Sequence, residues 1–217
     1  MKRTLVLAAI LMTGAALVSV SAQDITLQAG GKTGLNFGWF SGDDWDTFVD
    51  ATNKGSNGVG VGFTLGGFAE IGITEQFAAQ PEILFFSQKG KVSGESQGDD
   101  ITSVTRINTI QIPMLAKGLF PIEQGTIYGI AGPSIFLAVG DTKVTTEIDG
   151  NKDSATDAPD NRLLFGLALG AGYEFPLEPG VLIGELRYTR VLSRYEDDFD
   201  AFGNTVSLLV GYGIPIE

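Results

Sequence analysis

The chain has 217 residues, with 26 acidic side chains against 14 basic ones and a formal net charge of −12. Because the electrostatic attraction that dominates DNA and RNA binding is missing from so acidic a chain, we exclude nucleic acid as a partner. The absence of cysteine and histidine also excludes a disulfide framework and catalysis by Ser-His or Cys-His pairs.

The N-terminal segment has the parts of a secretory signal peptide. Lys2 and Arg3 give a basic start, an apolar run follows over residues 5–20, and small residues come next. The apolar run is shorter than the roughly 20 residues that a membrane-spanning helix needs. We therefore expect residues 1–22 to be a cleaved signal peptide and residues 23–217 to form one outer-membrane β-barrel domain.

The rest of the chain alternates with period two, and we find no run of helical period after the signal peptide. The segment 162–175 is the clearest example, because Leu163, Phe165, Leu167 and Leu169 alternate with glycine, alanine and charged residues. Such alternation predicts strands with one apolar face and one small, polar face. The expected strands cover residues 25–40, 58–73, 78–93, 101–117, 126–140, 162–175, 182–189 and 205–216.

The connections between these strands alternate strictly between short and long. Short turns at one end and long loops at the other are typical of outer-membrane barrels. We therefore predict an all-β fold, an eight-stranded antiparallel up-and-down transmembrane β-barrel in the bacterial cell outer membrane. The short turns are expected at residues 74–76, 121–125 and 176–180, and the long loops at 41–57, 94–100, 141–161 and 196–202.

The small, polar face carries few charges and many glycines. It would make a poor water-exposed exterior, but it suits the lumen of a narrow barrel, which side chains fill. We therefore expect the apolar rows to face lipid, where a mid-membrane Arg or Lys would cost about 2–4 kcal/mol. The inward charges should pair as a network that fills the lumen, and we favour this structural role over a gate or selectivity filter. The network comprises Lys32, Glu70, Glu82, Lys117, Glu174, Glu185 and Arg187.

Aromatic residues lie near the ends of the predicted strands. Aromatic side chains of outer-membrane barrels form girdles at both membrane interfaces, and we expect such a role here, with ordinary core packing as the alternative. The residues concerned are Trp39, Phe40, Phe77, Phe120, Tyr173, Phe175 and Tyr212.

Three segments resemble an outer-membrane β-barrel domain family that includes PorT-type porin-like proteins. They are QPEILFFSQKG at residues 80–90, NTIQIPMLAKG at 108–118 and AGPSIFLAVG at 131–140. The resemblance implies a compact outer-membrane barrel and, for most members, no defined biochemical activity.

The long loops are acidic and contain one partial metal-binding pattern. In residues 149–160, Asp149, Asn151 and Asp153 match the first ligand positions of a calcium loop, but Ser154 replaces the glycine of the sharp turn. We therefore interpret this segment as a solvated acidic loop.

Aromatic residues within the loops leave two interpretations open. Trp45 and Phe48 in the first loop and Phe199 and Phe202 in the fourth either contact a partner or pack on the barrel rim. Loops on a rigid scaffold are common binding surfaces.

Together these patterns predict a non-enzymatic outer-membrane protein with a structural or interaction role, and a monomer. We expect no catalytic residue, cofactor or metal, and as partners outer-membrane lipid and an unidentified extracellular or envelope protein. One alternative is a small cation-favouring porin-like channel. The other is a periplasmic lipocalin-like carrier whose apolar rows face inward.

Overall fold

A computed structural model describes residues 26–50, 53–96, 99–148, 150–158, 161–193 and 201–216. The predicted signal peptide, residues 1–22, lies outside the described residues. None of the helices in the described part of the chain is long and apolar enough to cross a membrane. The elements are β1 (Thr26–Ser41), α2 (Asp43–Asp50), β2 (Asn53–Gly72), β3 (Phe77–Ser96), β4 (Asp99–Ile122), β5 (Gly125–Ala138), β6 (Thr142–Ile148), β7 (Asn151–Asp157), β8 (Leu163–Leu177), β9 (Gly180–Val191) and β10 (Phe202–Ile216).

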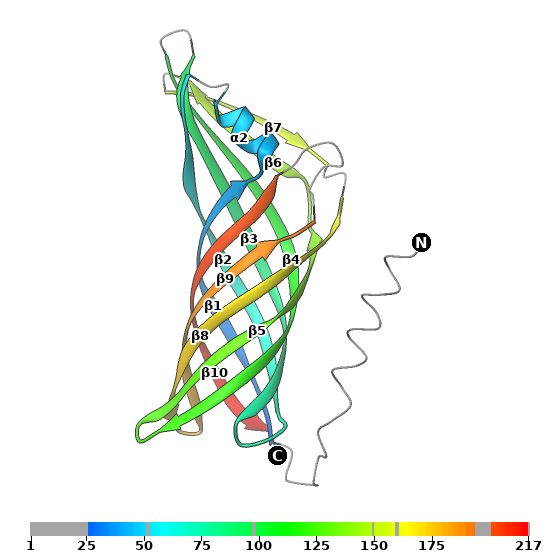
Figure 1. Cartoon of the computed structure of the whole chain (residues 1–217), viewed down its shortest axis with the longest axis vertical. Coiled ribbons are helices and arrows are strands. Elements are labelled where there is room, and N and C mark those ends of the chain that lie inside the picture. The colour runs from blue at the N-terminus through cyan, green and yellow to red at the C-terminus, as the bar shows by residue number, and fades with distance from the viewer. Residues whose placement is uncertain are drawn as a thin grey trace.

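The strands form one antiparallel sheet that closes on itself. β1 pairs with β2 on one side and with β10 on the other, and the additional pairing of β3 with β4 joins the two arms. The pairings therefore run in a ring through β1, β2, β3, β4, β5, β8, β9 and β10. Figure 1 shows the result, a tall barrel of tilted strands with the short turns at one end and α2, β6 and β7 at the other.

The prediction of an antiparallel all-β fold is confirmed, but the described residues contain ten strands, two more than expected. The predicted third loop, residues 141–161, is wrong in part because it contains the hairpin β6–β7. This hairpin pairs with the loop end of β4, where Ile101 lies opposite Ile148 and Arg106 opposite Lys143. Apart from Ala155, β7 is polar, and it offers no period-two pattern that could have predicted it.

The second long loop is shorter than predicted. Glu95 and Asp100, both within the predicted loop 94–100, are paired residues of β3 and β4. Of the predicted fourth loop, residues 196–200 lie outside the described part of the chain.

The apolar rows of the strands face outward. On β8, Leu163, Phe165 and Leu169 are 53%, 52% and 62% exposed, whereas Leu164 and Ala168 between them are 1% and 3% exposed. The predicted outward orientation is thus confirmed. The alternative of a carrier with inward apolar rows is wrong, because no shared core collects these side chains.

Glycine on the inner face of β2 allows the ring to be narrow. A Cβ built on Gly62 would lie 1.9 Å from the carbonyl oxygen of Ser87 on β3. Real Cβ atoms do not come this close to a backbone oxygen, so any larger residue would push the two strands apart. The abundance of glycine on the inner face therefore reflects close approach of neighbouring strands.

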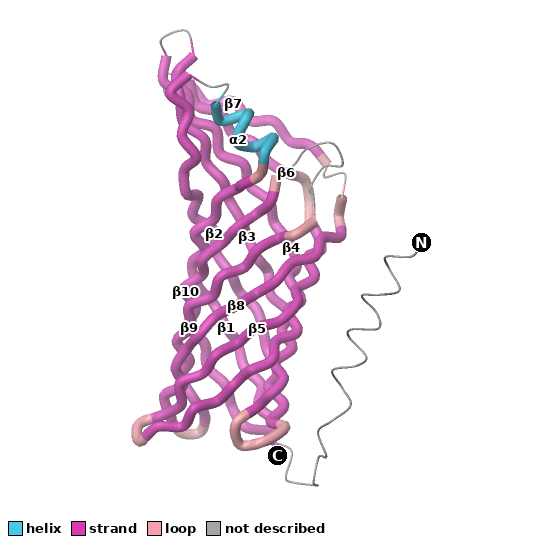
Figure 2. Tube along the Cα trace, viewed as in Figure 1, coloured by secondary structure: helices cyan, strands magenta, loops and turns pink. Residues whose placement is uncertain are grey.

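A helix occupies the predicted first loop, residues 41–57, which is a correction to the sequence interpretation. Acidic residues in its first turn, Asp43, Asp44 and Asp46, suit the positive end of a helix dipole. With only eight residues, α2 is too short to show a recognisable helical period. Figure 2 shows α2 at the loop end of the barrel.

The predicted girdle residues fall into two groups. Phe77, Phe120 and Phe175 are exposed on the outer surface near the short turns, where an interfacial girdle would lie. Phe40 is buried inside the loop end of the barrel, so its assignment to a girdle is wrong. It occupies an even position of β1, the inward row.

The remaining predicted girdle residues make contacts of their own. Trp39 packs against Tyr188, with ring centroids 6.4 Å apart. The Tyr173 hydroxyl donates to the carbonyl oxygen of Gln124, and the Tyr212 hydroxyl donates to the carbonyl oxygen of Leu177.

Candidate functional site

The candidate site is the interior of the ring, where all seven predicted charged residues lie in two ion-pair clusters. The cluster nearer the short turns joins Lys117 of β4 to Glu70 of β2 and Glu174 of β8. The Lys117 ammonium lies 2.5 Å from a Glu70 carboxylate oxygen and donates a second hydrogen bond to Glu174. It also lies 4.2 Å from the centre of the Tyr128 ring, a favourable cation–π contact. We call Lys117, Glu70 and Glu174 the lower cluster.

The upper cluster lies farther from the turns and consists of Lys32 of β1, Glu82 of β3, and Glu185 and Arg187 of β9. Lys32 donates to Glu82 at 2.9 Å and to Glu185 at 2.7 Å. Arg187 donates two hydrogen bonds to Glu82, at 2.6 and 2.9 Å, and a third to Glu185 at 2.6 Å. The paired donors of arginine match the two carboxylate oxygens, which makes this the stronger type of charge-assisted bond.

Burial makes these pairings necessary. The side chains of Lys32, Glu82 and Glu185 are 0% exposed and that of Arg187 is 2% exposed. Two cations and two carboxylates leave the upper cluster formally neutral, and a buried group of charges is tolerated only when it is paired in this way. The lower cluster has one cation and two carboxylates, so it is formally acidic.

Tyr128 of β5 links the two clusters. Its ring lies beside Lys117 of the lower cluster, and its hydroxyl donates to Glu185 of the upper cluster at 2.8 Å. The sequence interpretation missed this residue because the strand carries apolar side chains on both faces. The signal that could have revealed Tyr128 is its position in the inward-facing row of β5, together with Ile130 and Phe136.

A layer of uncharged polar side chains lies above the upper cluster. Asn36 accepts hydrogen bonds from Thr64 at 2.9 Å and from Ser207 at 2.8 Å. Gln111 donates to Ser134 at 3.1 Å. All five side chains are buried, so this level of the lumen is filled as well.

Apolar side chains occupy the lumen towards the loop end. Phe86, Phe136, Leu164 and Val191 form one buried cluster, with Phe86 and Phe136 in an edge-to-face contact at 6.0 Å. A second buried apolar cluster, which includes Phe68, Leu115 and Ile183, lies beside the ion pairs, so the interior combines polar and apolar side chains at both levels.

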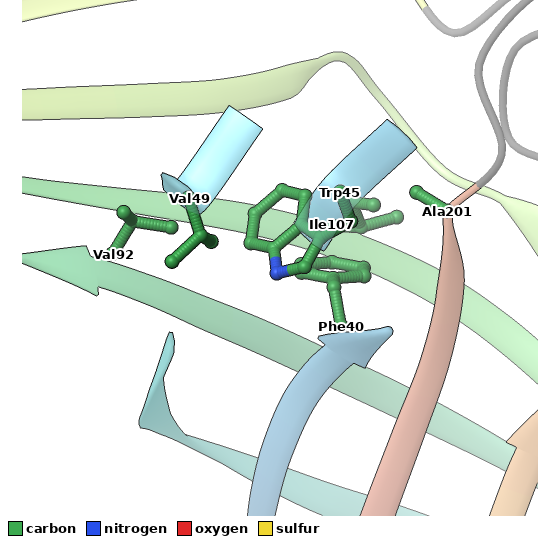
Figure 3. Close-up of a cluster of buried hydrophobic side chains, with 6 residues drawn as sticks. All are labelled: Phe40, Trp45, Val49, Val92, Ile107 and Ala201. Atoms are coloured by element: carbon green, nitrogen blue, oxygen red, sulfur yellow. The ribbon is translucent and has the colours of Figure 1, made fainter. Parts of the chain in front are cut away.

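The helix α2 covers the loop end of the lumen. Its residues Trp45 and Val49, one turn apart, pack with Phe40, Val92, Ile107 and Ala201, as Figure 3 shows. The Trp45 and Phe40 ring centres are 4.9 Å apart. Of the two interpretations of Trp45, packing on the rim is therefore the one observed.

The other loop aromatics give less information. Phe202 is half-buried, with the Arg190 guanidinium 5.9 Å from its ring centre, whereas Phe199 and the side chain of Phe48 lie outside the described part. The partial calcium pattern falls on β7, where Asn151 and Asp153 are exposed, and Asp149 is not described. No group of metal-binding side chains occurs among the described residues.

The closed ring with an apolar exterior and an ion-paired interior defines a membrane β-barrel. A family model for the outer membrane protein beta-barrel domain matches residues 21–194, and the chain belongs to this family. It is a protein of the bacterial outer membrane. No curated protein matches the chain.

Several solved outer-membrane structures are similar to this chain at low sequence identity. Neisserial surface protein A is 11% identical with a TM-score of 0.47, and the match covers 88% of this chain and 99% of that one. Ail of Yersinia pestis is 16% identical with a TM-score of 0.42, covering 87% and 99%. The N-terminal β-barrel domain of Pseudomonas aeruginosa OprF is 11% identical with a TM-score of 0.35, covering 84% and 97%.

Proposed function

We propose that this chain is a non-enzymatic outer-membrane β-barrel with a structural or interaction role, whose lumen is closed by its own side chains. The observation that carries the proposal is the burial of the upper cluster, in which Lys32, Glu82 and Glu185 have no exposed side-chain surface. A site for catalysis or passage needs room for a solute next to its polar groups, and these groups contact one another instead.

The membrane-spanning part of the proposed molecule is the ring of eight strands β1–β5 and β8–β10. The shortest of them, β9, has 12 residues, which exceeds the 9–11 residues that a tilted transmembrane strand needs. Among the described strands, β4 is the one with which the hairpin β6–β7 pairs, at its loop end, and the hairpin would lie outside the membrane. We further infer membership of the PorT-type porin-like group from the three segments at residues 80–90, 108–118 and 131–140.

The closure is layered. From the short turns to the loops, the lower cluster and the upper cluster come first. Next come the polar side chains around Asn36 together with the apolar cluster around Phe136, since Gln111 lies directly opposite Phe136 and Thr64 opposite Phe86. The helix α2 comes last. An ion would have to break buried salt bridges and pass the apolar side chains around Phe136, and both steps are costly. These costs favour the closed barrel over the cation-favouring channel.

The proposed partners are those that would cover the exposed apolar rows and the acidic loop end of the barrel. Lipid covers the exposed apolar rows, and the acidic first turn of α2 faces the outside together with the loops, where an extracellular or envelope protein would bind. We propose a monomer, because the ring closes within one chain and leaves no unpaired sheet edge in its spanning strands.

Planar-bilayer recording tests the closed lumen. The purified barrel should insert without giving a steady conductance, while a known porin in the same membrane serves as the positive control. Barrel integrity is checked beforehand by heat-modifiable migration on a denaturing gel. Steady, cation-selective conductance from the heat-modifiable protein would contradict the closed lumen and support the channel.

A further inference from the structure

Three basic side chains form a row on the outer surface of the barrel near its loop end. Lys89 of β3 lies directly opposite Arg106 of β4, and Arg106 lies directly opposite Lys143 of β6. Lys89 and Arg106 belong to outward rows, because their strand neighbours Gln88 and Ile107 are buried inside the barrel, and Lys143 is exposed on β6. Lys91, two residues farther along β3, adds a fourth positive charge to the same side.

This arrangement is unfavourable in isolation, because like charges directly opposite one another on neighbouring strands repel. None of Lys89, Arg106 and Lys143 forms an ion pair with the residues that the structure describes. An acidic protein with few basic residues thus concentrates three of them where none of the described carboxylates forms an ion pair with them.

A surface cavity of about 220 Å³ lies between these side chains and is lined by Lys89, Val104, Arg106, Lys143 and Thr145. Liquid water occupies about 30 Å³ per molecule, so the cavity can hold a phosphate group together with part of its hydration. Ammonium and guanidinium groups bind phosphate oxygens, and arginine binds them through two parallel bonds.

The row lies at the upper edge of the lipid-facing surface. Ile110 and Leu137, paired on β4 and β5, are the last apolar outward pair on these strands below it, and Asn108 comes next. Arg106 is two residues beyond Asn108, about 7 Å along an extended strand. In a barrel that spans the outer membrane as proposed above, this is the depth of the lipid headgroups.

We propose that Lys89, Arg106 and Lys143 bind a phosphate group, and that this phosphate belongs to a phosphorylated lipid of the outer leaflet. The assignment of the phosphate to a lipid rests on the proposed function, which places the barrel in the membrane. Phosphate binding itself rests on the row of basic side chains and its cavity alone. Anionic headgroups offset the repulsion within the row, and each basic side chain near the membrane surface strengthens the attraction.

The test uses the full chain, produced in the outer membrane of a bacterial host and extracted in a zwitterionic detergent. Calorimetric titrations use lipid A dispersed in the same detergent, phosphatidylcholine and inorganic phosphate. The site variant is Lys89→Gln/Arg106→Gln/Lys143→Gln. The matched control, Lys152→Gln/Arg162→Gln/Arg190→Gln, removes the same charge from other exposed positions of the loop end. Heat-modifiable migration shows that each barrel is folded, and the single variant Arg106→Gln is measured as well in case the triple variant fails to fold.

We expect the site variant to bind lipid A at least about tenfold more weakly, because three basic side chains near the headgroups are lost, while the control variant binds as the original chain does. Binding of inorganic phosphate but not lipid A, with the same dependence on the row, supports the phosphate site and overturns its lipid source. Equal affinity in site and control variants, or no binding by a heat-modifiable barrel, overturns the site. Failure of the original chain to enter the outer membrane as a heat-modifiable barrel would instead contradict the proposed function.

Discussion

Removing Arg187 tests whether the upper cluster stabilises the barrel. In an Arg187→Leu variant, Glu82 and Glu185 lose three hydrogen bonds from the guanidinium and keep Lys32 as their only cation. Two buried carboxylates then share one ammonium. Removal of one partner from a buried ion pair costs about 3–5 kcal/mol, because the other charge is left uncompensated. We expect a loss of this size in the free energy of unfolding.

The matched control is the double variant Arg187→Leu/Glu82→Leu, which leaves Lys32 and Glu185 as a neutral pair. It should be more stable than the single variant, because removing both members of a buried pair costs little when apolar groups replace them. The assay is urea unfolding of the refolded barrel in lipid vesicles, followed by tryptophan fluorescence and heat-modifiable migration. A single variant within about 1 kcal/mol of the original chain, or a double variant that is less stable than the single, would refute this account of the cluster.

Three further predictions concern the wall and the end of the barrel. Leu169→Arg should cost about 2–4 kcal/mol on the lipid-facing side of β8, and Leu177→Arg near the strand end only about 0–1 kcal/mol; equal unfolding free energies for the two in lipid vesicles would contradict the outward orientation. Gly62→Ala should lower stability by about 1–3 kcal/mol, because its Cβ would clash with the Ser87 carbonyl. Gly184→Ala, where a Cβ meets nothing within 4 Å, is its control, and equal urea midpoints would show that close strand approach does not matter. Trp45→Ala should loosen α2 and make the segment around it sensitive to limited proteolysis, while heat-modifiable migration persists. Unchanged proteolysis would mean that the Trp45 contacts do not hold the helix in place.

Period-two alternation was enough to predict the wall of the barrel. On β8, the row from Leu163 to Leu169 is apolar, and the intervening residues are small except for Leu164, so sequence alone largely separates the outer from the inner face. The inward position of each charged residue follows from the same parity. Leu84 and Phe86 share a face with Glu82, and the structure places all of them inside, as parity requires.

Local sequence could not predict the pairing partners inside the lumen. Arg187 and Glu82 are 105 residues apart in the sequence, and their contact depends on how far neighbouring strands are shifted along the ring. Similarly, α2 has only eight residues, of which Trp45, Phe48 and Val49 are apolar, and β7 has no apolar row. Both elements are held by neighbouring strands, so their own residues carry little signal.

The upper cluster also acts as a check on strand register. It joins β1, β3 and β9, none of which is hydrogen-bonded to another in the ring. A slip of one residue would turn Lys32, Glu82 or Arg187 towards hydrocarbon, and a slip of two would leave a buried charge without its partner. One correctly aligned arrangement of eight strands is therefore strongly preferred over its shifted neighbours, even though glycine-rich strands alone specify their alignment weakly.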